Sequence, residues 1–170
     1  MAGLTGAETV IDAYCGTGTI GLVAARRGAA RVIGVDSVPS AIRDAVSNAR
    51  HNGVENAEFV AQDATAFMKE LAAERGVAGN GASAKGAEDA TPLVLLMDPP
   101  RAGSTPEFLA AAAALAPERI VYISCNPATQ ARDVRQLVEA GYEVRAIRPV
   151  DMFPHTDHVE SIVMLEKNND

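Results

Sequence analysis

Short apolar runs alternate along the chain with longer, alanine-rich stretches of mixed polarity. The runs are rich in Val, Ile and Leu, which is typical of buried strands, and the stretches between the first six of them fit helices. Strands are therefore predicted at 9–14, 31–36, 57–62, 92–97, 119–124, 142–148 and 158–166. Strands that alternate with helices produce a parallel sheet covered on both faces, so the predicted fold is α/β, doubly wound and Rossmann-like.

The end of the chain departs from this alternation. Only PVDMFPHTD separates the sixth predicted strand from the seventh, and this segment leaves no room for a helix. The seventh strand is therefore expected to return antiparallel, in a hairpin, and to complete a seven-stranded and mostly parallel sheet. That arrangement is the pattern of a class I S-adenosylmethionine methyltransferase.

Length and composition indicate one globular domain. The 170 residues suit a single domain over 1–170, in which the small and polar residues 76–91 are predicted to form a flexible surface insertion. No apolar run approaches the roughly 20 residues of a membrane span, and no basic-then-apolar leader precedes the first strand. A cytoplasmic protein without membrane contact is expected. The net charge of −7 argues against a surface that grips a phosphate backbone unaided.

A glycine-rich turn follows the first predicted strand. The segment DAYCGTGTIG contains Gly16, Gly18 and Gly21, and Asp36 ends the second strand twenty residues after Gly16. Such a turn lets the backbone and a helix N-terminus approach a ligand, and the acidic residue can accept hydrogen bonds from both hydroxyls of a ribose. An adenosine ligand is predicted, either a nicotinamide dinucleotide or S-adenosylmethionine.

Three further acidic positions favour S-adenosylmethionine. Asp12 lies inside the first strand, Asp63 ends the third, and Asp98 opens the motif Asp-Pro-Pro-Arg at the end of the fourth. A dehydrogenase would not need that last motif. Two alternatives stay open: Asp36 and Asp63 could be helix caps, and Tyr14 could either line the cofactor pocket or only pack.

The two cysteines need separate explanations, because two are too few for a disulfide scaffold or a four-thiolate metal site, and no metal is predicted. Cys15 follows an aromatic residue in a tight turn and is interpreted as a buried filler. Cys125 ends the fifth strand, and the Asn126-Pro127 that follows is a good helix start. The helix N-terminus favours a thiolate there, although an inert Cys remains an alternative. Asp98 and Cys125 should face one crevice, because both lie at the carboxyl ends of strands.

Four segments carry a resemblance to a known family. DAYCGTGTIGL, LLMDPPRAG, VYISCNPATQARD and PVDMFPHTDHVESIVML resemble the catalytic domain of the RNA uracil-5-methyltransferases, which methylate carbon 5 of uridines in tRNA or 23S ribosomal RNA. The resemblance implies that Cys125 is the nucleophile, that Glu160 is the general base and that Asp98 lies at the methyl donor and target base. The residues expected to bind S-adenosylmethionine are Tyr14, Gly16, Gly18, Thr19, Asp36, Asp63 and Asp98.

The resemblance also sets expectations about substrate and partners. The substrate is expected to be a single-stranded or flipped-out uridine, because a base-paired uridine cannot present carbon 6 to a thiolate. The PHTDHVES ending favours 23S ribosomal RNA, while His155 and His158 are structural or base-contacting. This chain is expected to lack the family's upstream RNA-binding domain, its cofactor-binding Gln and the cluster cysteines of some members, and to be a monomer. The alternatives are an NAD-dependent oxidoreductase and a non-catalytic cofactor- or RNA-binding module.

Overall fold

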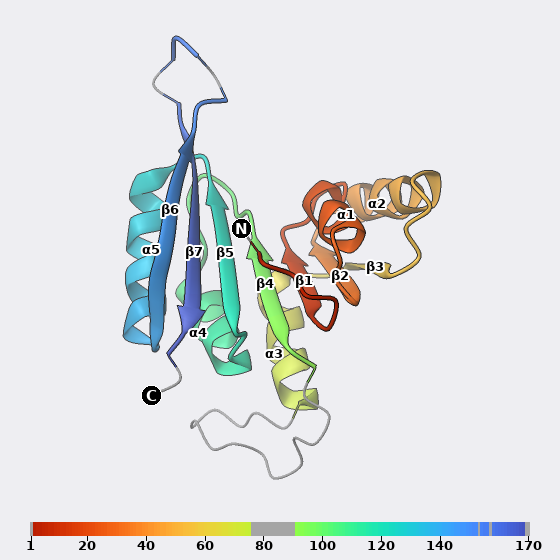
Figure 1. Cartoon of the computed structure of the whole chain (residues 1–170), viewed down its shortest axis with the longest axis horizontal. Helices are drawn as coiled ribbons and strands as arrows, with labels where there is room; N and C mark the ends of the chain where they lie inside the picture. The colour runs from red at the N-terminus through yellow and green to blue at the C-terminus, as the bar shows by residue number, and fades with distance from the viewer. Residues whose placement is uncertain (1, 76–90, 153, 157, 169–170) are drawn as a thin grey trace.

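The computed structural model describes residues 2–75, 91–152, 154–156 and 158–168. Its centre is one seven-stranded sheet with the strand order β3-β2-β1-β4-β5-β7-β6 (Figure 1). The strands are β1 (Thr9–Ala13), β2 (Arg31–Asp36), β3 (Ala57–Ala61), β4 (Leu93–Met97), β5 (Arg119–Ser124), β6 (Tyr142–Val150) and β7 (Glu160–Lys167). Neighbours from β3 to β5 pair in parallel, whereas β7 runs antiparallel to both β5 and β6.

The predicted doubly wound fold with an antiparallel last strand is confirmed, and only strand ends differ. β6 continues to Val150 and pairs it with Glu160, so the hairpin reaches beyond the predicted end at residue 148. β6 is one of the two edge strands of the sheet, and an edge strand tolerates Pro149 within it. The predicted flexible insertion at 76–91 falls, except for Thr91, outside the described residues.

Helices cover the sheet on both faces. They are α1 (Thr19–Arg26), α2 (Pro39–His51), α3 (Ala64–Glu74), α4 (Pro106–Leu115) and α5 (Pro127–Glu139). Because successive strand residues point to opposite faces, Val10 packs with α1 and α2 while the adjacent Ile11 packs with α3 and α4. In the described ranges, no helix combines the length and the apolar character that a membrane span requires.

The burial pattern explains why the central strands could be read from the sequence. Every residue of β1 and of β4 is buried, because helices cover both faces there, and both strands are continuous apolar runs apart from Thr9 and Asp12. Because β1, β2, β4 and β5 run parallel, their carboxyl ends lie at the same end of the sheet. For β4 and β5 this end is at the top of Figure 1. In doubly wound folds a ligand crevice forms outside this end.

Candidate active site

A cavity of about 460 Å³ opens at this end of the sheet, and three acidic or nucleophilic side chains line it. Asp98 follows β4, Cys125 follows β5 and Glu160 begins β7. The remaining lining is apolar: Ile123, Val150, Met152 and Ile162. The strand register produces this grouping, since Ile162 pairs with Ile123 and Glu160 pairs with Val150. The structure thus brings together the nucleophile, the base and the acidic motif residue predicted from the sequence.

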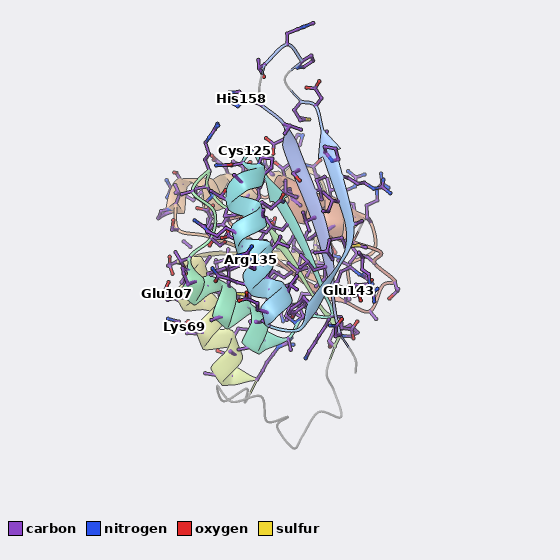
Figure 2. All side chains as sticks on the ribbon, turned by 90° about the vertical axis from the view of Figure 1, so that its left-hand side faces the viewer. Lys69, Glu107, Cys125, Arg135, Glu143 and His158 are labelled. Carbon is purple, nitrogen blue, oxygen red and sulfur yellow. The ribbon has the colours of Figure 1, made fainter. Side chains whose placement is uncertain are left out.

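Cys125 lies at the junction of β5 and α5, at the N-terminal end of the helix in Figure 2. Asn126 is the N-cap, and its side chain accepts a hydrogen bond from the Ala128 N–H at 3.2 Å; Pro127 is the first helical residue. The predicted helix start is therefore confirmed. The half-buried Cys125 is accessible from the cavity and borders the positive end of the helix dipole, which favours an anion.

Asp98 and Glu160 interact electrostatically within the cavity wall. Partial burial raises the pKa of the Asp98 carboxyl above its ordinary value, and the neighbouring charge of Glu160 raises it further. Ionisation of one carboxyl group therefore disfavours ionisation of the other, as expected of acidic groups that share one site.

Backbone N–H groups and carboxylates hold the glycine turn between β1 and α1. The Gly16 N–H donates to Asp36 Oδ2 at 2.9 Å, and the Gly21 N–H donates to Asp12 Oδ2 at 2.8 Å. Gly18 has a φ of +82°, and a Cβ there would lie 2.8 Å from the Phe59 ring, so only glycine suits this position. The turn is thus fixed by β1 and β2 together.

The carboxylate of Asp12 is buried with only one of its oxygens satisfied. Asp12 is 1% exposed, and its Oδ1 has no hydrogen-bond partner among the described residues. Burial, and then the charges of Asp98 and Asp36, raise the pKa of Asp12 to about 7. The carboxyl groups of Asp12, Asp36 and Asp98 therefore lie close enough for their negative charges to repel one another.

The two helix-cap alternatives have different outcomes. Asp63 is the N-cap of α3 and accepts a hydrogen bond from the Ala66 N–H at 2.9 Å, so this alternative is confirmed. Asp36 is not the N-cap of α2, because Val38 takes that position. Asp36 Oδ1 instead accepts the Val38 N–H at 2.8 Å, while its other oxygen holds the glycine turn.

Three neighbours of the glycine turn have contacts that the sequence did not reveal. Tyr14 adopts a φ of +63°, packs against Phe108 with ring centroids 5.2 Å apart, and places its hydroxyl 3.4 Å from Ser104 Oγ. Thr19 is exposed and lines a separate cavity of about 250 Å³ between α1 and α2. Cys15 is buried, as predicted, and burial raises the pKa of its thiol to about 12. Cofactor contact by Tyr14 and Thr19 stays a prediction.

Site residues of two kinds were not among those predicted from the sequence. One is the apolar lining of the cavity, whose members lie on three strands and the segment after β6. The other is a pair of buried polar residues on α5, Gln130 and Asp133, which bond to backbone near the site. Their signal was present in the sequence, because residues 130, 133 and 137 share one helix face and Leu137 marks that face as buried.

Comparisons with known proteins agree with this geometry. Residues 4–168 match the family model described as tRNA (Uracil-5-)-methyltransferase. An uncharacterized RNA methyltransferase of Halalkalibacterium halodurans is 47% identical over 169 residues, which are 99% of this chain and 34% of that protein. A similar relative from Bacteroides thetaiotaomicron is 47% identical over 166 residues, 98% of this chain and 33% of its own. The chain thus spans about a third of the length of these relatives.

Solved structures add a second line of similarity. One similar structure is the Pyrococcus abyssi tRNA (uracil-54, C5)-methyltransferase in complex with S-adenosyl-L-homocysteine. Its TM-score is 0.72 and its sequence identity 37%, and the match covers 95% of this chain and 35% of that protein. An rRNA methylase from Streptococcus thermophilus, at 14% identity and a TM-score of 0.67 over 96% of this chain and 89% of its own, shares the fold. The fold is that of the class I S-adenosylmethionine methyltransferases. Within that class, the chain belongs to the tRNA (uracil-5-)-methyltransferase family. Membership of a methyltransferase family removes the support for an NAD-dependent oxidoreductase.

S-adenosylmethionine is the methyl donor of this fold class, and the crevice residues fit it. The donor carries a sulfonium and an ammonium group, and positive charge would offset the mutual repulsion of Asp12, Asp36 and Asp98. Asp36 keeps acceptor capacity beyond its two backbone bonds, which suits ribose hydroxyls. A Cβ at Gly16 would meet nothing within 4 Å, so space remains beside the turn.

Proposed function

We propose that the chain is the catalytic domain of an enzyme that methylates carbon 5 of uridine in RNA through a covalent bond to Cys125. The observation that carries the proposal is the shared cavity of Cys125, Glu160 and Asp98. A nucleophile, a base and a further carboxyl group meet there on an apolar floor. The membership of a uracil-5-methyltransferase family supports the choice of uracil over other bases.

The apolar part of the cavity suits a single base. Ile123 and Ile162 form one wall, and Val150 and Met152 form another part of the lining. Such side chains pack against the faces of a planar ring, and a base enters a pocket of this kind only when it leaves a stack or lies in a single strand. The target is therefore a loop or flipped-out uridine, held by Asp98 at its polar edge.

Cys125 starts the reaction because carbon 5 of uracil is too weak a nucleophile by itself. A bond forms between the Cys125 sulfur and carbon 6, and the electron pair of the double bond between carbons 5 and 6 moves toward carbon 5. When bound, S-adenosylmethionine supplies an electrophilic methyl group. Carbon 5 uses its electron pair to form a bond to that methyl group, and the bond between the methyl group and the donor sulfur breaks with release of S-adenosyl-L-homocysteine. The Cys125 sulfur stays bonded to carbon 6.

Glu160 completes the cycle. Its carboxylate accepts the proton of carbon 5, and the electron pair left behind re-forms the double bond between carbons 5 and 6. The bond to the Cys125 sulfur then breaks, and the thiolate leaves with its electrons. The products are 5-methyluridine and the free nucleophile, while the proton remains on Glu160 until solvent removes it.

The RNA substrate has two candidates. The PHTDHVES ending favours 23S ribosomal RNA, whereas the related Pyrococcus abyssi enzyme is a tRNA methyltransferase. We propose the ribosomal substrate and a monomeric catalytic domain over 1–170. Because the net charge is −7 and the chain spans about a third of its relatives, we also propose that most of the RNA affinity comes from regions outside this match.

Intact-mass spectrometry of the chain with S-adenosylmethionine and RNA hairpins that contain 5-fluorouridine tests the proposal. Fluorine at carbon 5 cannot leave as a proton, so the methylated RNA should stay attached to Cys125. Cys125→Ala should form no adduct, and Cys15→Ala is the matched control that should still form it. An adduct with Cys125→Ala contradicts the proposed chemistry. So does the absence of an adduct with a wild-type chain that calorimetry shows to bind S-adenosylmethionine and that is saturated with the hairpin. The yields with ribosomal and tRNA hairpins decide the substrate.

A further inference from the structure

One face of α5 contacts the loop 101–104, which follows β4. Asn126 Nδ2 and Thr129 Oγ1 both donate to the backbone carbonyl of Arg101, at 3.1 and 3.2 Å. One turn further along, Arg132 Nη2 donates to two more carbonyl groups of the loop, at 3.0 and 3.3 Å. Residues three apart lie on the same side of a helix, so these side chains form one row against the loop.

Asp133 joins the same loop to β5. It is fully buried, and its Oδ2 accepts the Ser104 N–H at 2.7 Å and the Tyr122 O–H at 2.7 Å. Its Oδ1 accepts from Arg132 Nε at 2.8 Å. Gly103 has a φ of +82°, and a Cβ there would lie 2.6 Å from Asp133 Oδ2. A buried carboxylate with three donors forms a strong and directional junction.

Gln130 bonds to the two strands that carry the nucleophile and the base. It is 2% exposed, and its Nε2 donates to the Tyr122 carbonyl at 2.9 Å and to the Ser161 carbonyl at 3.0 Å. Tyr122 lies three residues before Cys125, and Ser161 directly follows Glu160. A single buried amide therefore links β5 to β7 beside the cavity.

We propose that Gln130 and Asp133 are positioning residues of the active site. Gln130 holds Glu160 in place relative to Cys125, and Asp133 holds the loop 101–104 and, through it, Asp98. α5 thus orders all three functional side chains from one helix face. The roles of these three side chains rest on the proposed function, but the geometric statement about Gln130 can be tested without RNA.

Gln130 and Asp133 should affect different steps of the reaction. Opposite effects of the two substitutions therefore distinguish a positioning role from a general loss of structure. Gln130→Met removes both donors at similar volume and frees Glu160, so proton removal from the methylated adduct should slow and adduct with ordinary uridine should accumulate. Asp133→Asn replaces one acceptor oxygen with a donor and loosens the Asp98 loop, so adduct should form more slowly and not accumulate. A displacement of about 1 Å at a reacting group costs up to roughly 100-fold in rate.

The first measurement uses the protein alone. NMR titration of the Asp98 carboxyl in wild type and in Glu160→Gln gives the effect of the neighbouring charge, whose loss should lower the pKa of Asp98. Gln130→Met should also lower the pKa of Asp98, because Glu160 then moves away from it. Gln136→Met is the matched control, because Gln136 lies on the same helix and its side chain makes no hydrogen bond to any residue that the structure describes.

The second measurement adds S-adenosylmethionine and an RNA hairpin with ordinary uridine, and follows the covalent fraction by denaturing mass spectrometry. We expect adduct to rise at least tenfold in Gln130→Met, to fall in Asp133→Asn and to stay unchanged in Gln136→Met. If Gln130→Met no longer unfolds cooperatively, Gln130→Asn replaces it, because the shorter amide cannot reach both carbonyl groups.

The outcomes separate the inference from the proposed function. An Asp98 titration in a folded Gln130→Met that matches wild type overturns the role of Gln130, whatever the RNA experiment gives. Adduct formation at the wild-type rate in Asp133→Asn, followed with 5-fluorouridine RNA, overturns the role of Asp133. A wild-type chain without any adduct counts against the proposed function, while the Asp98 titration still decides whether Gln130 positions Glu160.

Discussion

Replacement of Gly103 by Ala tests how tightly the loop 101–104 is held against α5. Gly103 has a φ of +82°, and an added Cβ would lie 2.6 Å from both Arg132 Nη2 and Asp133 Oδ2. The left-handed backbone alone costs about 1–2 kcal/mol for a residue with a side chain. The Cβ must also displace Asp133 from at least one donor, and a hydrogen bond to a charged group contributes about 1.5–3 kcal/mol.

The expected loss in the free energy of unfolding is therefore roughly 2.5–5 kcal/mol for Gly103→Ala. Gly141→Ala is the matched control, because Gly141 has a φ of +94° and an added Cβ there would meet nothing within 4 Å. It should lose only the backbone contribution. Urea unfolding measures both values, and in thermal unfolding the difference corresponds to about 3–12 °C for a domain of this size. An equal loss in the two variants would show that Asp133 and Arg132 do not confine the loop.

Three further predictions concern the cavity and the buried acids. Iodoacetamide at pH 8 should label Cys125 and leave Cys15 unmodified in the folded chain, because Cys15 is buried and its pKa is raised to about 12; peptide mass spectrometry that finds equal labelling would contradict this. The pKa of Asp12 is raised to about 7, so the folded state binds the proton more tightly than the unfolded state, and ionisation destabilises the fold as pH rises from about 4 to 7. Asp12→Asn should therefore gain stability relative to wild type in urea unfolding at pH 8 compared with pH 5, and a difference that does not change with pH would refute it. Glu160→Gln should form the methylated adduct but release it about 100-fold or more slowly, and stopped reactions with ordinary uridine RNA that show normal release would exclude Glu160 as the base.

Local signals predicted the fold and the start of the site well. The apolar runs predicted all seven strands. The signal is clearest for β1 and β4, which are buried on both faces and are therefore almost entirely apolar. The start of α5 was predicted correctly because the Asn126 side chain accepts a hydrogen bond within its own turn, and because the fixed φ of Pro127 suits the first helical position. Such features need no knowledge of distant residues.

The remaining features depend on contacts between distant parts of the chain. Gln130 bonds to the Ser161 carbonyl 31 residues away, and its position in the sequence does not reveal that partner. Asp36 had two plausible local roles, and only the structure shows that it bonds to both the glycine turn and the start of α2. The apolar cavity lining likewise arises from the register of β5, β6 and β7.

The reversed direction of β7 determines where its first residue lies. The parallel strands deliver side chains to the crevice at their last residues, whereas an antiparallel strand delivers them at its first. Had β7 run parallel to β5, Glu160 would lie at the opposite end of an eight-residue strand, roughly 25 Å from Cys125. The hairpin between β6 and β7 thus reverses the chain direction and places Glu160 at the same end of the sheet as Cys125, 35 residues earlier in the sequence. Lengthening or shortening β7 at its C-terminal end should leave the placement of Glu160 opposite Cys125 unchanged. Sequence changes at that end are therefore free of catalytic constraint.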